Sequence, residues 1–209
     1  MPVKVKICGI TNTPDAMAAA EAGADVLGFM FHEQSPRFVG IGEAAEIIRQ
    51  LPPHVLKAGV FVNAPEDFVT EAIQECGLNL LQFHGEETPE YCLQFGRLSI
   101  KAFRIRDTAS LERLGAYKTD AFLLDAYSPS QRGGTGETFN WALAADAQKF
   151  GRPIFLAGGL KPENVAEAIL RVRPYGVDVS SGVEKAKGVK DHAKVKAFIE
   201  AAKGVSVGS

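Results

Sequence analysis

Short apolar runs alternate with amphipathic stretches along the whole chain. The first run, residues 3–8, alternates β-branched residues with Lys4, Lys6 and Cys8 and breaks at Gly9, a period-2 pattern that predicts a strand. Runs of the same kind predict seven further strands, at residues 25–31, 55–62, 78–83, 99–103, 121–124, 153–156 and 177–179. Each strand is separated from the next by a stretch that has the length and pattern of a helix.

The clearest helical stripe is formed by Ala44, Ile47, Ile48 and Leu51, which share one helix face and stop before the prolines at 52–53. Comparable signals open helices near residues 13, 64, 88 and 162, and mark others at residues 111–114, 139–147 and 195–202. Eight strand-then-helix units in one direction require a parallel sheet with right-handed crossovers. An open doubly wound sheet of this length would usually have fewer strands, so the α/β pattern favours a closed (β/α)8 TIM barrel.

Composition narrows the class of protein further. The 209 residues carry a formal net charge of −2, which does not favour nucleic acid or an anionic membrane surface as a partner. No apolar run approaches the ~18 residues of a membrane span, and the start of the sequence lacks the apolar region of a signal peptide. The three cysteines form no CxxC pair, so neither a disulfide framework nor a metal site is expected. Without a linker, residues 1–209 are expected to form one cytoplasmic barrel domain with short loops.

A barrel would explain the mixed face of the first strand. If Cys8 points into the lumen, alternation directs Lys4 and Lys6 inward too, and buried ammonium groups need partners. The same parity directs Asp178 of the last strand inward, beside the first strand once the barrel closes. Gln82 of the fourth strand is inward as well. We therefore expect a polar layer of Lys6, Gln82 and Asp178 beneath the mouth of the barrel.

Barrel active sites lie at the carboxyl ends of the strands, where this chain places a set of polar residues and glycines. They are Cys8, Arg37, His84, Asp125, Gly158, Gly159, Ser180, Ser181 and Gly182. A cysteine in an apolar run is usually a core residue, but at a strand end before a glycine Cys8 could serve as a base in its thiolate form. Asp125 brings a carboxylate to the point where its strand leaves the core, unless it is only a helix cap or a turn residue.

The other candidates point to an anionic ligand. The guanidinium of Arg37 suits a carboxylate or a phosphate, unless Arg37 is a plain surface residue. His84 has even odds of packing or of touching a ligand. The clusters at residues 158–159 and 180–182 follow the seventh and eighth strands, where barrels often bind phosphate through backbone N–H groups. The glycine-rich residues 132–136 would form either a cover over the site or a bare loop.

Several segments together resemble the phosphoribosylanthranilate isomerase family of tryptophan biosynthesis, and the resemblance covers essentially the whole chain. These segments are Lys-Ile-Cys-Gly-Ile-Thr at 6–11, Ser-Pro-Arg at 35–37, Gln-Phe-His-Gly at 82–85, Leu-Asp at 124–125, Gly-Gly-Thr-Gly at 133–136, Ala-Gly-Gly-Leu at 157–160 and Asp-Val-Ser-Ser-Gly-Val-Glu at 178–184. The first and the last are highly specific. The resemblance implies a barrel enzyme that needs neither a cofactor nor a metal.

The implied reaction is the Amadori rearrangement of N-(5-phosphoribosyl)anthranilate to its 1-deoxyribulose 5-phosphate isomer. In this scheme Asp125 is the acid that opens the sugar ring, and Cys8 is the base that removes the C2 proton. Arg37 would hold the anthranilate carboxylate, and the amides of Gly159 and Ser181 would hold the phosphate. The implied partner is a small phosphorylated substrate, and the chain would be a monomer or a homodimer.

Competing functions make different demands on the strand ends. The aminoaldose isomerase of histidine biosynthesis, a sugar-phosphate isomerase on the same barrel, is expected to carry an aspartate where Cys8 stands. A metal-dependent epimerase would need histidines at the strand ends, and an indole-forming synthase would need inward lysines near the mouth. Lys101 is one position away from such a location. A non-catalytic barrel that senses a phosphorylated ligand would have no need of both an acid and a base.

Overall fold

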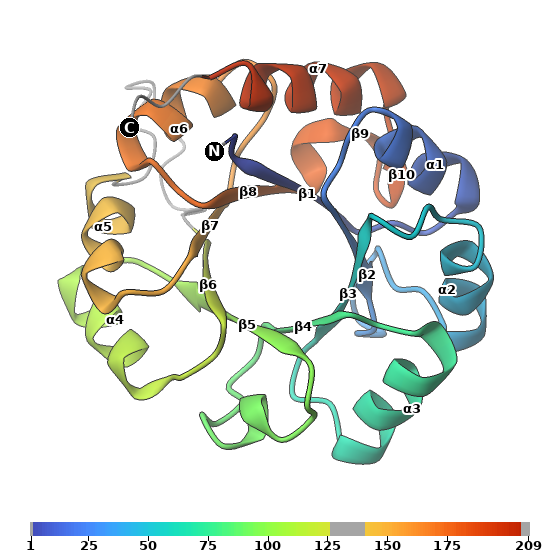
Figure 1. Ribbon diagram of the computed structural model, residues 1–209, viewed down its shortest axis with the longest axis horizontal. Helices are drawn as coiled ribbons and strands as arrows, with labels where there is room; N and C mark the ends of the chain where they lie inside the picture. The colour runs from blue at the N-terminus through green and yellow to red at the C-terminus, as the bar shows by residue number, and fades with distance from the viewer. Residues whose placement is uncertain (1, 126–140, 206–209) are drawn as a thin grey trace.

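The computed structural model describes residues 2–125 and 141–205, which form a closed parallel barrel surrounded by helices (Figure 1). The strands pair in chain order, and the eighth closes on the first, which confirms the predicted (β/α)8 architecture. They are β1 (Lys4–Cys8), β2 (Val26–Met30), β3 (Leu56–Phe61), β4 (Leu80–Phe83), β5 (Leu98–Arg104), β6 (Ala121–Asp125), β7 (Ile154–Ala157) and β8 (Gly176–Val179).

Strand alternation divides the buried residues into two sets. Outward-facing residues such as Ile7, Phe83 and Val177 pack under the helices and build the larger core. Inward-facing residues of β2 to β7 form a separate apolar cluster inside the barrel. Its members are Val26, Ala58, Leu80, Ile100, Ala102, Ala121, Leu123, Phe155 and Ala157. Apolar side chains therefore fill much of the lumen, and the buried charged pair of Lys6 and Asp178 lies on β1 and β8.

The helices follow the predicted order with one exception. They are α1 (Thr13–Glu21), α2 (Ile41–Ile48), α3 (Glu66–Cys76), α4 (Thr108–Glu112), α5 (Trp141–Asp146), α6 (Val165–Val172) and α7 (His192–Lys203). After β4 the expected helix is only a 3-10 turn, Tyr91–Leu93. The connection is short, and Glu87 within it binds the backbone of Asn63 and Gly85, which draws the chain away from a helical path.

A β-hairpin between β8 and α7 was not expected from the sequence. It consists of β9 (Glu184–Ala186) and β10 (Val189–Lys190), which pair antiparallel beside α1 (Figure 1). Strands of three and two residues are too short to show a period in the sequence. Within the described residues, no helix is long and apolar enough to cross a membrane. The glycine-rich residues 132–136 lie outside the described residues.

The prediction that Lys4 faces the lumen is wrong, because β1 begins at this residue and its side chain lies at the amino-terminal rim. The Lys4 side chain is 44% exposed, and its Nζ lies 3.0 Å from Oδ1 of Asp25. Oδ2 of Asp25 accepts a hydrogen bond from the Val5 amide at 2.9 Å, and Lys203 of α7 lies 3.1 Å away. Asp25 therefore joins β1 to the last helix.

Asp25→Asn should lower the free energy of unfolding at pH 7 by about 1–3 kcal/mol, as expected when a charge-assisted hydrogen-bond network is weakened. Burial raises the pKa of Asp25, but hydrogen bonds from Val5, Lys4 and Lys203 outweigh it and hold the pKa below its ordinary value. A carboxyl group with a lowered folded-state pKa stabilises the fold above its unfolded-state pKa and loses this contribution as the pH falls. Denaturant titrations should therefore show a smaller difference from wild type below about pH 4.

Glu200→Gln is the matched control for this prediction. Glu200 and Lys196 form an exposed pair 3.8 Å apart on α7. A pair of this kind contributes little in water, so the control should change the free energy of unfolding by less than about 0.5 kcal/mol. Equal losses in the two variants would contradict the structural role assigned to Asp25.

Candidate active site

The end of β1 brings a thiol and an ammonium group together inside the barrel. Gly28 of β2 makes room for them, since a Cβ at this position would lie 2.8 Å from Cys8 Sγ and 3.1 Å from Lys6 Nζ. The Lys6 side chain is fully buried, and its Nζ lies 2.7 Å from Oδ1 of Asp178 on the neighbouring β8. This contact confirms the predicted Lys6–Asp178 pair.

Lys6 remains charged in this environment. Burial lowers its pKa, but the Asp178 carboxylate and the Cys8 thiol outweigh burial and raise the pKa above its ordinary value. A hydrogen bond to Cys8 contributes to this shift, so Lys6 interacts with the candidate base as well as with Asp178. The ammonium group of Lys6 therefore lies next to the candidate base at the end of β1.

His84 follows β4 and lies against Gln82, as alternation predicted. Gln82 Nε2 lies 3.0 Å from His84 Nδ1, and Gln82 is buried. Burial lowers the pKa of His84, and the carboxylates of Asp125 and Asp178 oppose this shift without reversing it. The imidazole is therefore neutral at pH 7. When Gln82 Nε2 donates to Nδ1, the ring proton lies on Nε2, and Gln82 Oε1 stays buried without a hydrogen-bond partner among the described residues.

Asp125 is the last residue of β6, where it lies beside Ala157 of β7 and Arg104 of β5. Alternation from Leu123, which belongs to the apolar cluster in the lumen, directs the Asp125 side chain inward. Asp125 is half-buried at the carboxyl end of its strand. Two strands, β7 and β8, separate β6 from β1 on the shorter path around the barrel, so the carboxylate and the Cys8 thiol approach the mouth from different sides.

Arg37, in the connection after β2, lies at the end of β1 and is held by a carboxylate. Its aliphatic stem covers Gly9, which has a φ of +76° and no room for a side chain. Its Nε and Nη2 donate to Oε1 and Oε2 of Glu184 at 2.7 and 2.8 Å. These hydrogen bonds and the charge of Glu184 raise the pKa of Arg37. The guanidinium expected from the sequence is thus at the mouth, but already paired.

The two glycine-rich loops meet above β7 and β8. Gly158 and Gly159 have φ values of +88° and +67°, a left-handed conformation that favours glycine. Gly182 packs directly against the carbonyl oxygen of Leu160, where a Cβ would collide. Ser180 Oγ is buried without a hydrogen-bond partner among the described residues. The two loops therefore touch through backbone atoms at the carboxyl ends of β7 and β8, where barrels often bind phosphate.

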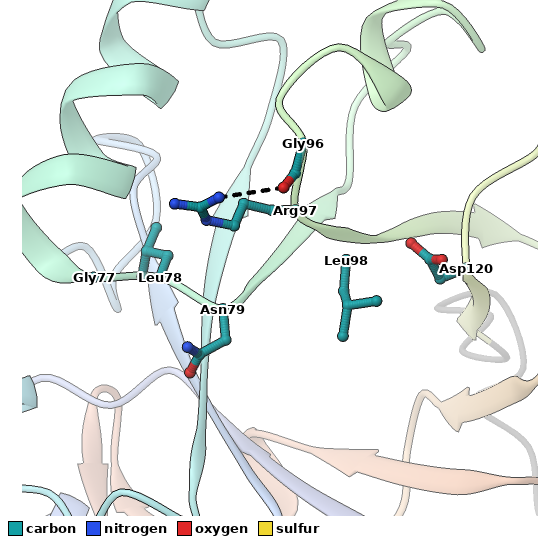
Figure 2. Close-up of a pocket in the computed structure, with 7 residues that line it drawn as sticks. All are labelled: Gly77, Leu78, Asn79, Gly96, Arg97, Leu98 and Asp120. Carbon is teal, nitrogen blue, oxygen red and sulfur yellow. Dashed lines mark hydrogen bonds between the residues drawn. The ribbon is translucent and has the colours of Figure 1, made fainter.

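Two further features of the described residues lie away from this mouth. Figure 2 shows a hollow lined by Leu78, Leu98 and Asp120, which precede or begin β4, β5 and β6 and so lie at the opposite, amino-terminal end of the barrel. Lys101 of β5 is buried outside the lumen, where its Nζ contacts Glu87 at 2.8 Å. The mouth thus lacks the lysine that an indole-forming synthase would use at this position.

Fold and site together define a class of protein, the (β/α)8-barrel enzymes that act on small anionic molecules. The thiol of Cys8 ends β1, the imidazole of His84 follows β4, and the carboxylate of Asp125 ends β6. The guanidinium of Arg37 follows β2, and the glycine-rich loops follow β7 and β8. Such a set can bind an anion and move protons. Glu184 and Lys190 complete the site from the hairpin, and only Glu184 had a sequence signal, as the last residue of the 178–184 segment.

Comparisons with known proteins identify the family. The family model for N-(5'-phosphoribosyl)anthranilate (PRA) isomerase matches residues 5–201. The N-(5'-phosphoribosyl)anthranilate isomerase of Geotalea uraniireducens is 57% identical over 202 residues, which are 97% of this chain and 99% of that protein. The chain belongs to the N-(5'-phosphoribosyl)anthranilate isomerase family.

Solved structures agree with this assignment over the same length. The crystal structure of phosphoribosyl anthranilate isomerase from Thermotoga maritima matches with a TM-score of 0.91 and 44% identity, and covers 97% of this chain and 100% of that one. A second crystal structure of such an isomerase, in complex with reduced 1-(o-carboxyphenylamino)-1-deoxyribulose 5-phosphate, matches with a TM-score of 0.88 and 42% identity at the same coverage.

Lys101→Met should lower the free energy of unfolding by about 3–5 kcal/mol, because it leaves the Glu87 carboxylate buried without its cation. Adding Glu87→Gln should recover part of this loss, since the partner then carries no charge. The exposed Lys118→Met serves as the control. Denaturant titrations in which Lys101→Met and Lys118→Met behave alike would contradict the structural role of Lys101.

Proposed function

We propose that this chain catalyses the Amadori rearrangement of N-(5-phospho-β-D-ribosyl)anthranilate to 1-(2-carboxyphenylamino)-1-deoxy-D-ribulose 5-phosphate in tryptophan biosynthesis. One observation carries the proposal. A chain that matches the isomerase family over residues 5–201 presents a thiol at the end of β1 and a carboxylate at the end of β6, both at one mouth. The reaction needs one acid and one base, and these residue types can supply them.

The acid and the base act in sequence. Asp125 donates its proton to the ring oxygen of the ribose, the C1–O bond breaks, and the nitrogen lone pair forms a C1=N iminium. The iminium acidifies the C2 proton, which the Cys8 thiolate removes to give an enolamine. The enolamine then takes up a proton at C1 and releases the one on its C2 hydroxyl to become the ketone, so substrate and product are isomers. The ammonium group of Lys6 lies next to this sulfur atom.

Binding uses the groups around this pair. The N–H groups of Arg37 that Glu184 does not occupy would bind the anthranilate carboxylate. Backbone amides of Gly159 and Ser181 would bind the phosphate, supported by Gly158, Ser180 and Gly182 in the two touching loops. His84 would donate its Nε2 proton to a sugar oxygen. The ligand bound to the relative, reduced 1-(o-carboxyphenylamino)-1-deoxyribulose 5-phosphate, carries a carboxylate and a phosphate, as the proposed product does. We propose a small phosphorylated substrate as the partner of the chain, which acts as a monomer or a homodimer.

Cys8→Ala and Asp125→Asn should each lower kcat by roughly two orders of magnitude or more, the loss expected when a general base or acid is removed. The measurement follows the loss of phosphoribosylanthranilate fluorescence under saturating substrate. Cys76→Ala is a matched control. Burial raises the pKa of this thiol to about 11, and Cys76 is the buried last residue of α3, outside the barrel. Near-normal turnover in both variants would falsify the assigned roles.

Arg37→Ala should act mainly on KM. A residue that binds the substrate carboxylate equally in the ground state and the transition state contributes uniform binding, so its loss weakens substrate binding and leaves kcat nearly unchanged. The same fluorescence assay, run over a range of substrate concentrations, separates the two constants. A variant that lost only kcat would show that Arg37 does not bind the ground state.

A further inference from the structure

Lys190, the last residue of β10, is a buried cation that the proposed reaction does not use. Its side chain is fully buried, and its Nζ contacts three oxygens at the end of the barrel. It donates to the carbonyl oxygen of Cys8 at 2.6 Å, to that of Ser180 at 3.3 Å and to Oε1 of Glu184 at 3.0 Å. A single ammonium group thus joins the ends of β1 and β8 to the hairpin.

Glu184 links this ammonium group to Arg37. Its side chain is 5% exposed, and it accepts both hydrogen bonds from the guanidinium. Burial raises the pKa of Glu184, but Arg37 and Lys190 outweigh it and hold the pKa below its ordinary value, so the carboxylate stays ionised. One carboxylate between two cations leaves the cluster with a net positive charge, which suits an anionic ligand at the mouth.

The hairpin that carries both residues is held firmly against the connection that follows β1. Thr11 Oγ1 donates to the carbonyl oxygen of Gly188 at 2.5 Å. The Lys190 amide donates to Oδ2 of Asp15 at 2.7 Å, and Oδ1 of this carboxylate lies 2.8 Å from Nε2 of His192. Hydrogen bonds with Thr11 and Asp15 therefore fix the backbone of the hairpin that carries Lys190 and Glu184.

We propose that Glu184 and Lys190 are positioning residues, which hold Arg37 and the Cys8 strand end in one fixed arrangement for the substrate. This inference rests on the proposed function. An arginine carries five N–H donors, and Glu184 accepts from two of those on Arg37, which leaves three for an anion. An arginine that is already held in place loses little conformational freedom when it binds an anion. The two hydrogen bonds to Glu184 should therefore strengthen substrate binding by Arg37. The contact of Lys190 with the Cys8 carbonyl fixes the thiol relative to the phosphate loops.

Glu184→Asp separates this role from charge alone. The variant keeps a carboxylate beside Lys190, so the buried charges remain balanced, but its shorter side chain no longer reaches both Nε and Nη2 of Arg37. We expect KM to rise about tenfold with a much smaller change in kcat, as when a charge-assisted hydrogen bond to the ligand is misaligned. Asp25→Asn at the opposite end of the barrel is the control, and it should lower stability without changing KM.

A double-mutant cycle tests whether Glu184 acts through Arg37. In an Arg37→Ala background, Glu184→Asp should add less than about twofold to KM, because the group that it positions is absent. Additive effects on KM, or an unchanged KM in the single variant, would overturn the positioning role of Glu184. A wild-type chain without any turnover would instead contradict the proposed function, and the positioning role with it.

Lys190→Met tests the other half of the proposal. It should lower kcat about tenfold, measured per folded molecule, and the same substitution should have no further effect on the residual rate of Cys8→Ala. Thermal unfolding of each sample gives the folded fraction at the assay temperature. A kcat that follows the folded fraction alone would assign Lys190 a purely structural role. If this variant does not fold, Lys190→Arg, which keeps the cation but changes its contact with the Cys8 carbonyl oxygen, is measured in the same way and decides this half of the proposal.

Discussion

The buried pair of Lys6 and Asp178 is the interaction on which the rest of the structure depends. Removing each of these charges from water costs on the order of several kcal/mol. Only a close, hydrogen-bonded partner of opposite charge can offset this desolvation penalty. The pair satisfies this demand at 2.7 Å across β1 and β8, the two strands that close the barrel. Closure in another register would leave both charges buried and unpaired. The same pair also places an ammonium group next to the Cys8 thiol, so the closure of the fold and the charge of the site depend on one contact.

The apolar part of the lumen strengthens this arrangement. The inward apolar residues of β2 to β7 form a buried cluster beside the charged pair of β1 and β8. Charges interact more strongly in such surroundings than in water. Lys6 therefore influences both Cys8 and the more distant His84, whose pKa it helps to lower. Gly28 permits this close approach because it brings no side chain into the space that the thiol and the ammonium group share.

The sequence was sufficient for the barrel and for its central pair, because strand parity and the count of eight units together place Asp178 beside Lys6. Parity says which face a residue occupies but not how deep it lies, which is why Lys4 was wrongly expected inside the barrel. The hairpin and Lys190 left no pattern to detect, since the strands are too short and two of the three oxygens that Lys190 contacts belong to the backbone. Every residue has a backbone carbonyl oxygen, so the residue types do not indicate which of these oxygens will bind a buried lysine. The resemblance, by contrast, supplied the proposed roles of the strand-end residues, which physical reasoning alone left open.

The cations around the mouth share one property that follows from these contacts. Lys6 is paired with Asp178, and Arg37 and Lys190 are both paired with Glu184. A site that offered bare cations to an anionic substrate would bury unpaired charge whenever it stood empty, at a high cost in stability. Pairing each cation with a carboxylate lowers that cost, and it leaves three N–H groups of the Arg37 guanidinium that Glu184 does not occupy. The carboxylates of Asp178 and Glu184 therefore allow a cluster of cations to be stable at this end of the barrel before any anion binds.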